Sequence, residues 1–343
     1  MYIENYQIKK FISVWLGIMF FLISIMIVVG GLTRLTDSGL SITQWQLFSG
    51  FLPPLNQSDW IYYFDLYKKI PEYKIQNFSM SIEEFKVIFW WEWIHRFFGR
   101  LIGISFLLPL IYLTFKVGFK KLINLYIIFI LICFQGFIGW YMVSSGLVDR
   151  VDVSHYRLSA HLLVAFLILS LIFWNYLLVK INHQLFAGLN NWLIIFFVIL
   201  IFAQIAIGAF VSGMDAGKIY NTWPLMGANY FPDDNKFYNL FSLKAFDDPS
   251  LVQFMHRNLA YFIFFFYLIL LFKVYRNKLT NLVSSINLIG ILLLLQIILG
   301  ILTLLYGAQI FISSMHQISS IFLVSSSIYL LFINTKSNLQ LSN

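Results

Sequence analysis

Four histidines carry the clearest chemistry in this sequence. Each lies a few residues inside one end of a long apolar segment, and they are His95, His161, His256 and His316. An ionisable side chain inside a membrane segment needs a partner and is usually functional. Two imidazoles that face each other can bind a haem iron from opposite sides. We therefore predict haem ligation, with His95 paired to His161 and His256 paired to His316. Zinc or copper is a weaker alternative, because no thiolate, carboxylate or third histidine joins either pair.

The depth of these histidines supports the interpretation. Each stands two to four residues from the outer end of its segment, or roughly 3 to 6 Å at the rise of a helix. A single histidine at this depth is more readily explained as an interfacial residue bound to a neighbour or a lipid headgroup. Four at similar depth, in two repeated pairs, favour ligation. His155 and His183 have no such repeat, and we expect them to be exposed.

Arginines follow the first histidine of each pair, as Arg96 and Arg257. Haem propionates are anionic, and a guanidinium can bind a carboxylate through two parallel hydrogen bonds. We predict that these arginines bind propionates. Snorkelling to the interface or contact with lipid phosphate is the alternative.

The composition is that of an integral membrane protein. Hydrophobic residues make up 60% of the 343 residues and charged residues only 11%, whereas soluble domains carry about a quarter charged residues. The net charge of +8 comes largely from lysines in short loops, so we predict no nucleic-acid binding. The single cysteine, Cys133, excludes an intramolecular disulfide.

Eight apolar segments are long enough to cross a bilayer as helices. They are Phe11–Leu32, Trp93–Phe115, Leu122–Ser144, Leu158–Val179, Trp192–Ser212, Phe254–Phe272, Leu282–Tyr306 and Ile312–Ile333. Lysines concentrate on one side of this arrangement, which the positive-inside rule makes cytoplasmic. Both termini are then expected in the cytoplasm. The long connections 33–92 and 213–253 are expected outside.

The second half of the chain repeats the first. Asp215 and Trp223 follow Asp37 and Trp45 at the same offset, since 215 − 37 and 223 − 45 are both 178. At a second shared offset of 161, His95, Arg96, Gln135 and Gly139 recur as His256, Arg257, Gln296 and Gly300. We predict an all-α membrane fold of two four-helix bundles, residues 1–180 and 181–343, related by a pseudo-two-fold axis along the membrane normal.

The halves differ in charge beside the histidines. Glu92 stands one helical turn before His95 and on the same face, and its counterpart is the neutral Gln253. A carboxylate there can act as a base, a proton relay or a stabiliser of developing positive charge. The alternative is a helix-start residue favoured by the helix dipole.

Two further arginines mark the first half. Arg34 and Arg100 have the neutral counterparts Ser212 and Tyr261. We predict that both arginines help to bind the haem of the first half. The two sites are therefore predicted to be unequal.

At these residues the chain resembles the haem A synthase family. The resembling motifs are Gly30-Gly31-Leu32-Thr33-Arg34-Leu35-Thr36 with Ser38-Gly39-Leu40-Ser41, Glu92-Trp93-Ile94-His95-Arg96 with Gly99-Arg100, and Asp215-Ala216-Gly217 with Asn221-Thr222-Trp223-Pro224-Leu225-Met226. Some bacterial members carry a cysteine pair in the first external loop. This chain lacks it and is similar to the subgroup without the pair.

The resemblance implies an enzyme that oxidises the C8 methyl of haem o to a formyl group. The product, haem a, serves haem–copper terminal oxidases. It further implies a haem b on His256 and His316, the substrate haem o on His95 and His161, and Glu92 near the reacting edge of the porphyrin. A bacterial inner membrane is the expected location, with both sites toward the periplasmic leaflet. Membrane lipid, haem o synthase, oxidase assembly proteins and an unnamed electron-transfer partner are the expected partners.

Our mechanistic hypothesis is two successive oxidations of one methyl carbon, to an alcohol and then to a gem-diol that loses water. Oxygen insertion by iron, and electron abstraction followed by attack of water, both remain open. A rival is a di-haem b cytochrome that carries electrons between quinol and an acceptor. A haem chaperone without chemistry is a third reading. The cytochrome reading does not explain why Glu92 corresponds to a glutamine in the repeat.

Overall fold

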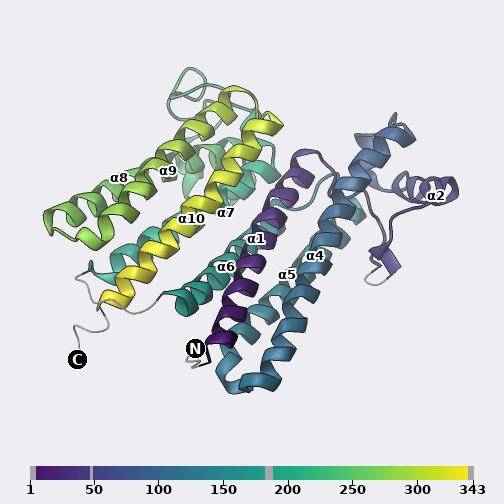
Figure 1. The fold of residues 1–343 in the computed structure, drawn as a ribbon. Coiled ribbons are helices and arrows are strands. Elements are labelled where there is room, and N and C mark those ends of the chain that lie inside the picture. The colour runs from purple at the N-terminus through teal and green to yellow at the C-terminus, as the bar shows by residue number, and fades with distance from the viewer. Residues whose placement is uncertain (1–4, 47–48, 182–187, 339–343) are drawn as a thin grey trace. The chain divides into compact units, whose positions relative to one another are not determined.

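The computed structural model describes residues 5–46, 49–181 and 188–338, and this part of the chain is almost entirely helical. Eight long helices dominate it (Figure 1): α1 (Tyr6–Leu35), α4 (Ile82–Val117), α5 (Ile123–Asp149), α6 (His155–Lys180), α7 (Asn191–Gly213), α8 (Pro249–Arg276), α9 (Thr280–Leu305) and α10 (Ile310–Asn338). Each is long and apolar enough to cross a membrane. The predicted eight spans and the all-α class are therefore confirmed.

The connections contain short helices. Two α-helices, α2 (Gln57–Tyr67) and α3 (Pro71–Ile75), lie between α1 and α4. Single 3-10 turns make up the remainder: η1 (Ser49–Phe51), η2 (Phe119–Leu122), η3 (Ala216–Lys218), η4 (Phe237–Phe241) and η5 (Leu243–Asp247).

The chain forms two compact units. One consists of residues 21–165, and the other of residues 1–20 together with 166–343. The boundaries fall inside α1 and α6, and each unit contains one histidine pair. The proposed division at residue 180 and the pseudo-two-fold axis stay predictions.

In the unit of residues 21–165, α4 begins well before the predicted apolar span. Ser81 and Glu84 form a capping box that satisfies free N–H groups at the helix start. The first three turns then bury Phe85 and Phe89 against Phe64 and Tyr67 of α2. This aromatic cluster outside the apolar span fixes the start of α4, and hence the residues that precede His95.

In the second unit, four helices form a closed ring. Helix α7 packs against α8 and α10, and α9 packs against the same two helices (Figure 1). Helices α8 and α10 therefore lie diagonally across this bundle, and these are the helices that carry His256 and His316. At the far end of α10 the fully buried Asn334 accepts a hydrogen bond from the Leu189 N–H (2.7 Å) and donates one to the Leu189 carbonyl (2.9 Å). This pair ties the chain just before α7 to α10.

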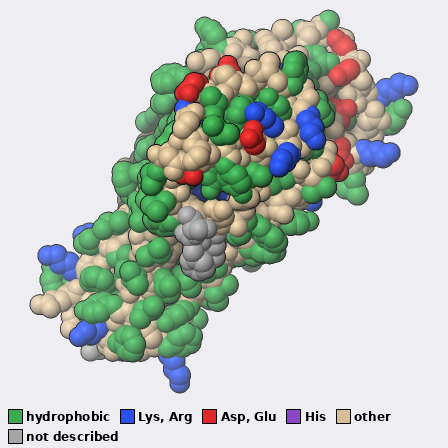
Figure 2. Space-filling view, turned by 90° about the vertical axis from the view of Figure 1, so that its right-hand side faces the viewer, with side chains coloured by type: hydrophobic (Ala, Val, Ile, Leu, Met, Phe, Trp, Pro, Cys, Tyr) green, Lys and Arg blue, Asp and Glu red, His purple; other side chains and the backbone are tan. Residues whose placement is uncertain are grey.

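The surface agrees with a lipid-facing protein. Hydrophobic side chains cover much of the face in Figure 2, and charged side chains gather toward its ends. Large apolar side chains within the spans are openly exposed, among them Phe21, Ile130 and Phe265, each more than half exposed. A soluble protein rarely leaves so many large apolar groups in water.

The turn after the first helix of each repeat has the same backbone. Asp37 and Asp215 both adopt the left-handed region, with φ of 49° and 51°. Few residues other than glycine adopt it, although aspartate does so more readily than most. The two aspartates matched in the sequence thus share the same φ region.

Candidate functional site

Each of the four histidine rings packs against a glycine of the long helix before it. A methyl group added at the glycine would lie close to the ring, 3.3 Å away for Gly30 and His95, 3.0 Å for Gly139 and His161, 3.0 Å for Gly208 and His256, and 3.2 Å for Gly300 and His316. Such contacts are tighter than most, so a side chain at the glycine would require the ring to shift. The glycines therefore create the space that the imidazoles occupy.

Three of the histidines are also held by an amide one helical turn before the glycine. The side-chain Nε2 of Gln135 donates to the carbonyl of His161 (3.0 Å), that of Gln204 to His256 (3.1 Å) and that of Gln296 to His316 (3.0 Å). We call this hydrogen bond the amide anchor. It fixes the histidine's helix to its neighbour at the level of the ring.

The residues present fit a haem iron between two imidazoles. The ring centres of His95 and His161 are 6.3 Å apart. Metal–imidazole bonds are about 2 Å long, so one metal ion fits between two ring nitrogens. The Nδ1 atoms of His161, His256 and His316 are buried without a hydrogen-bond partner in the described part of the chain, and buried polar atoms normally have one.

The donor set also argues against other metals. Within residues 5–46, 49–181 and 188–338, no group of three or more His, Cys, Asp or Glu side chains is placed to hold an ion. Zinc sites use three or four protein ligands. Two facing imidazoles with apolar surroundings suit a porphyrin, which supplies the other four ligands itself.

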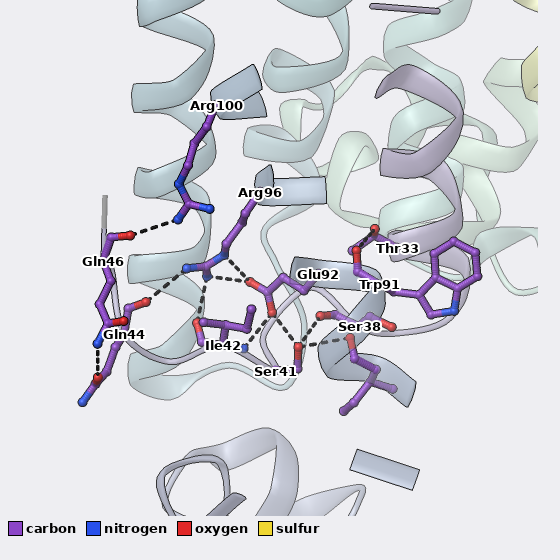
Figure 3. Close-up of polar contacts among 11 residues, drawn as sticks. Thr33, Ser38, Ser41, Ile42, Gln44, Gln46, Trp91, Glu92, Arg96 and Arg100 are labelled. Carbon is purple, nitrogen blue, oxygen red and sulfur yellow. Dashed lines mark hydrogen bonds and ion pairs between the residues drawn. The ribbon is translucent and has the colours of Figure 1, made fainter. Parts of the chain in front are cut away.

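Glu92 is buried, with 3% of its surface exposed, and its carboxylate is fully bound (Figure 3). Oε2 accepts hydrogen bonds from the Ser41 hydroxyl and from the Ile42 N–H, both at 2.7 Å. Oε1 accepts from Nε (3.0 Å) and Nη2 (2.6 Å) of Arg96. All four contacts come from donors, which suits an ionised carboxylate. The loop after α1 therefore locks Glu92 in place.

Arg96 and Arg257 make equivalent contacts in the two halves. Arg96 donates to the carbonyls of Ile42 (2.8 Å) and Gln44 (3.1 Å), and Arg257 donates to those of Tyr220 (2.9 Å) and Thr222 (3.0 Å). The two carbonyls in each half correspond at the offset of 178 residues. Both arginines thus clamp the loop that follows the first helix of the repeat. Their predicted contact with propionates stays a prediction.

The remaining predicted arginines lie in the same unit as Glu92. Arg34 forms ion pairs with Asp37 and with Asp152, the latter at 3.7 Å. Arg100 donates to the Gln46 carbonyl at 2.9 Å. Beside it lies a small hollow, with room for about one water molecule, whose wall includes Arg96, Arg100 and Trp93. Two cationic side chains in one hollow suit an anionic group.

The second half has no carboxylate in the position of Glu92. Gln253 is equally buried, with 3% exposed, and its Nε2 donates to the Tyr220 carbonyl at 3.2 Å. The structural position is preserved while the charge is lost. The difference between the halves is therefore chemical rather than architectural.

His155 corrects one expectation. It is half-buried at the start of α6, because its ring packs against that of Tyr156 with the ring centres 4.3 Å apart. His183 lies outside the described residues.

One buried carboxyl outside the spans is not predictable from the sequence. Glu72 on α3 is 2% exposed, and burial, followed by the negative charges of Glu92 and Asp152, raises the pKa of Glu72 to about 8. Asp37 adds to the same repulsion, and the neighbouring Tyr67 has a raised pKa for similar reasons. No spacing in the sequence signals this group, because only tertiary packing buries it.

We expect Glu72→Gln to make the protein less sensitive to alkaline pH. Its pKa is raised from 4.5 to about 8, so the folded chain keeps a proton that the unfolded chain releases. Stability therefore falls as pH rises through this window. Glutamine has no proton to lose. Melting curves at about pH 5 and about pH 8.5 should show the variant gaining a few degrees relative to the parent at the higher pH. An equal difference at both pH values would refute the burial argument.

Fold and site together define a polytopic membrane protein with two pairs of buried histidines, one of them beside a buried carboxylate. Residues 13–328 match the family model described as cytochrome oxidase assembly protein, COX15-CtaA. The chain belongs to this family.

Relatives cover nearly the whole chain. A protein named Heme A synthase from Pelagibacter ubique (strain HTCC1062) is 46% identical over 339 residues, which is 98% of this chain and all of the relative. Proteins of the same name from Rickettsia bellii (strain OSU 85-389) and Maricaulis maris (strain MCS10) are 41% and 40% identical over 92% of this chain, and 96% and 93% of their own lengths.

Proposed function

We propose that the protein is a haem A synthase, an oxidoreductase that converts the C8 methyl of haem o to the formyl of haem a. The observation that carries this proposal is the Glu92–Arg96 pair, which lies one helical turn from His95 and has the neutral Gln253 in its place in the second half. A symmetrical electron carrier has no need of this difference. The names of the full-length relatives support the same activity.

The histidine pairs are assigned different haems in this proposal. His256 and His316 hold a resident haem b, and His95 and His161 hold the substrate haem o. Support comes from the amide anchors, since both histidines of the second pair have one and the surroundings of that pair lack the carboxylate. A resident cofactor benefits from rigid surroundings without a reactive carboxylate, and a changing substrate needs a reactive group.

The chain's own residues then have defined tasks. The resident haem, when bound, supplies a reversible one-electron carrier. Glu92 stabilises positive charge at the methyl carbon or accepts its proton, and Ser41, Ile42 and Arg96 hold the carboxylate for that task. Arg100, which lines the hollow beside Arg96, binds a propionate of haem o, and Arg34 adds positive charge to the same unit.

The location is part of the proposal. The protein is placed in a bacterial inner membrane with both termini in the cytoplasm and the histidine sites toward the periplasmic leaflet. The lysines of the short loops support this orientation. Haem o synthase and oxidase assembly proteins are proposed partners, because haem o is insoluble in water and its product must be passed on.

Mass spectrometry of extracted haem tests the function. We expect purified protein from cells that make haem o to contain haem b together with haem o, hydroxylated haem o or haem a. His95→Ala and His161→Ala should remove the second group and leave haem b. His256→Ala and His316→Ala should reduce haem b. Haem b alone, at two per chain, would instead identify an electron carrier.

A further inference from the structure

One position breaks the pattern that the histidine sites otherwise share. A Gln-x-x-x-Gly spacing precedes three of the histidines, at Gln135, Gln204 and Gln296. The fourth place is held by Met26, since 204 − 26 and 208 − 30 are both 178. Met26 precedes Gly30, which packs against His95. His95 is therefore the histidine whose carbonyl receives no amide anchor in the described part of the chain.

The ring of His95 is also placed differently. In the other three sites the ring atom nearest the glycine is Cε1, at 3.0 to 3.2 Å from an added methyl group. For His95 it is Nε2, at 3.3 Å. The planes of the His95 and His161 rings make an angle of 79°. The site without an amide anchor is thus the site with the different ring position.

The side chains explain why the two observations belong together. Glutamine donates a directional hydrogen bond and thereby fixes one helix against the other. Methionine has no donor, and its flexible thioether adapts to whatever packs beside it. The methyl group of Met26 lies 3.5 Å from the position of an added methyl at Gly99, one turn after His95. Met26 thus gives α4 an adaptable contact where the other sites have a fixed one.

We propose that Met26 is a positioning residue that makes His95 the displaceable iron ligand of the first site. This inference rests on the proposed function, because it needs a haem between His95 and His161. His161 keeps its amide anchor from Gln135 and stays bound. With a haem bound there, His95 would be the ligand that gives way to a small molecule, because Met26 contacts its helix by packing and supplies no hydrogen bond. The second site, anchored on both sides, stays closed.

Carbon monoxide is the probe, because it binds only ferrous haem with an open or displaceable ligand position. We expect the dithionite-reduced protein to bind carbon monoxide at one haem only. Met26→Gln should slow this binding by roughly fivefold or more, the effect of one added hydrogen bond. The reciprocal change, Gln204→Met, should open the second haem and add a second binding phase. Met26→Leu, which also lacks a donor, should keep the parent's rate.

The haem content of each variant, measured as the pyridine haemochrome, separates the two proposals. If Met26→Gln and Gln204→Met both keep their haems and the parent's carbon monoxide kinetics, the role of Met26 is refuted while the synthase assignment stands. If His95→Ala and His161→Ala leave the haem content unchanged, no haem occupies the first site and both proposals fall. Because the two exchanges are independent, misfolding of one variant still leaves the other as a test.

Discussion

Replacement of Glu92 by glutamine is expected to lower haem a output by about a hundredfold or more, the range for loss of a general acid–base group. The substrate haem should remain bound, because His95 and His161 are untouched. Haem o should accumulate in the purified variant. The readout is the ratio of haem a to haem o in the extract. A normal ratio would remove Glu92 from the reaction.

The structure suggests why glutamine is a severe change here. Both oxygens of Glu92 accept hydrogen bonds, from Ser41, Ile42 and Arg96. A glutamine amide must point its own N–H group at one of these donors. It also leaves Arg96 without its counter-charge, and breaking a buried ion pair costs about 3–5 kcal/mol. The variant therefore tests charge and position together.

A second substitution separates these effects. Ser41→Ala removes one 2.7 Å hydrogen bond and leaves the carboxylate paired with Arg96. If the charge of Glu92 is what matters, this variant should retain most haem a output. If Ser41→Ala is as inactive as Glu92→Gln, the exact placement of the loop rather than the carboxylate limits the reaction.

The duplicated clamp clarifies how one half came to differ from the other. Arg96 and Arg257 hold the same two loop carbonyls at the same offset, so the loop contact does not require a carboxylate. Gln253 occupies the equivalent position without a charge. Glu92 is therefore not required for the loop contact, which leaves its charge free for another role. Its cost in burial is offset by Arg96 and by two donors that the loop provides.

Long apolar runs made the eight helices predictable, because a membrane segment must satisfy its own backbone. The places of the four histidines in the apolar segments, and the two shared offsets, also made the histidine pairs and the repeat predictable. The early start of α4 was not predicted, since residues 82–92 are too polar to belong to a span. A capping box and an aromatic cluster with α2 keep that stretch helical. This packing depends on the fold of the connection between α1 and α4, which the sequence pattern does not predict.

The contacts of single side chains were the least predictable part. The burial of Glu72 depends on how α3 folds, and nothing in its neighbours foretells it. The binding of Arg96 to loop carbonyls is equally invisible without coordinates. In contrast, the Gln-x-x-x-Gly spacing was available in the sequence. Gln135 and Gln296 correspond at the offset of 161 residues, whereas Gln204 corresponds to Met26 at the offset of 178. The contacts of Gly30 and Gly208 with the histidine rings make this second correspondence clear.

Larger side chains at the glycines that pack against the histidine rings, here called the glycine cradles, are expected to remove one haem at a time. Valine at position 139 would place its first side-chain carbon 3.0 Å from Cε1 of His161, and valine at position 208 would do the same to His256. The branched valine should displace the histidine ring, because the contact is with the ring itself and the surrounding interior is close-packed. Gly139→Val should therefore lose the haem of the first site, and Gly208→Val the haem of the second.

A matched control lies on the same helix as the first of these changes. An added methyl at Gly136, three residues before Gly139 on α5, would meet nothing within 4 Å. Gly136→Val carries the same change of side chain and the same helix-propensity effect, so it should keep both haems.

Haem per chain, measured as the pyridine haemochrome, should fall by about one in Gly139→Val and in Gly208→Val, because each histidine pair binds a single iron. Full haem content in both would mean that the rings do not ligate iron where they now lie. Loss in all three variants would indicate general damage to the bundle. Loss in the two cradle variants alone is the result that only ligation by these histidines explains.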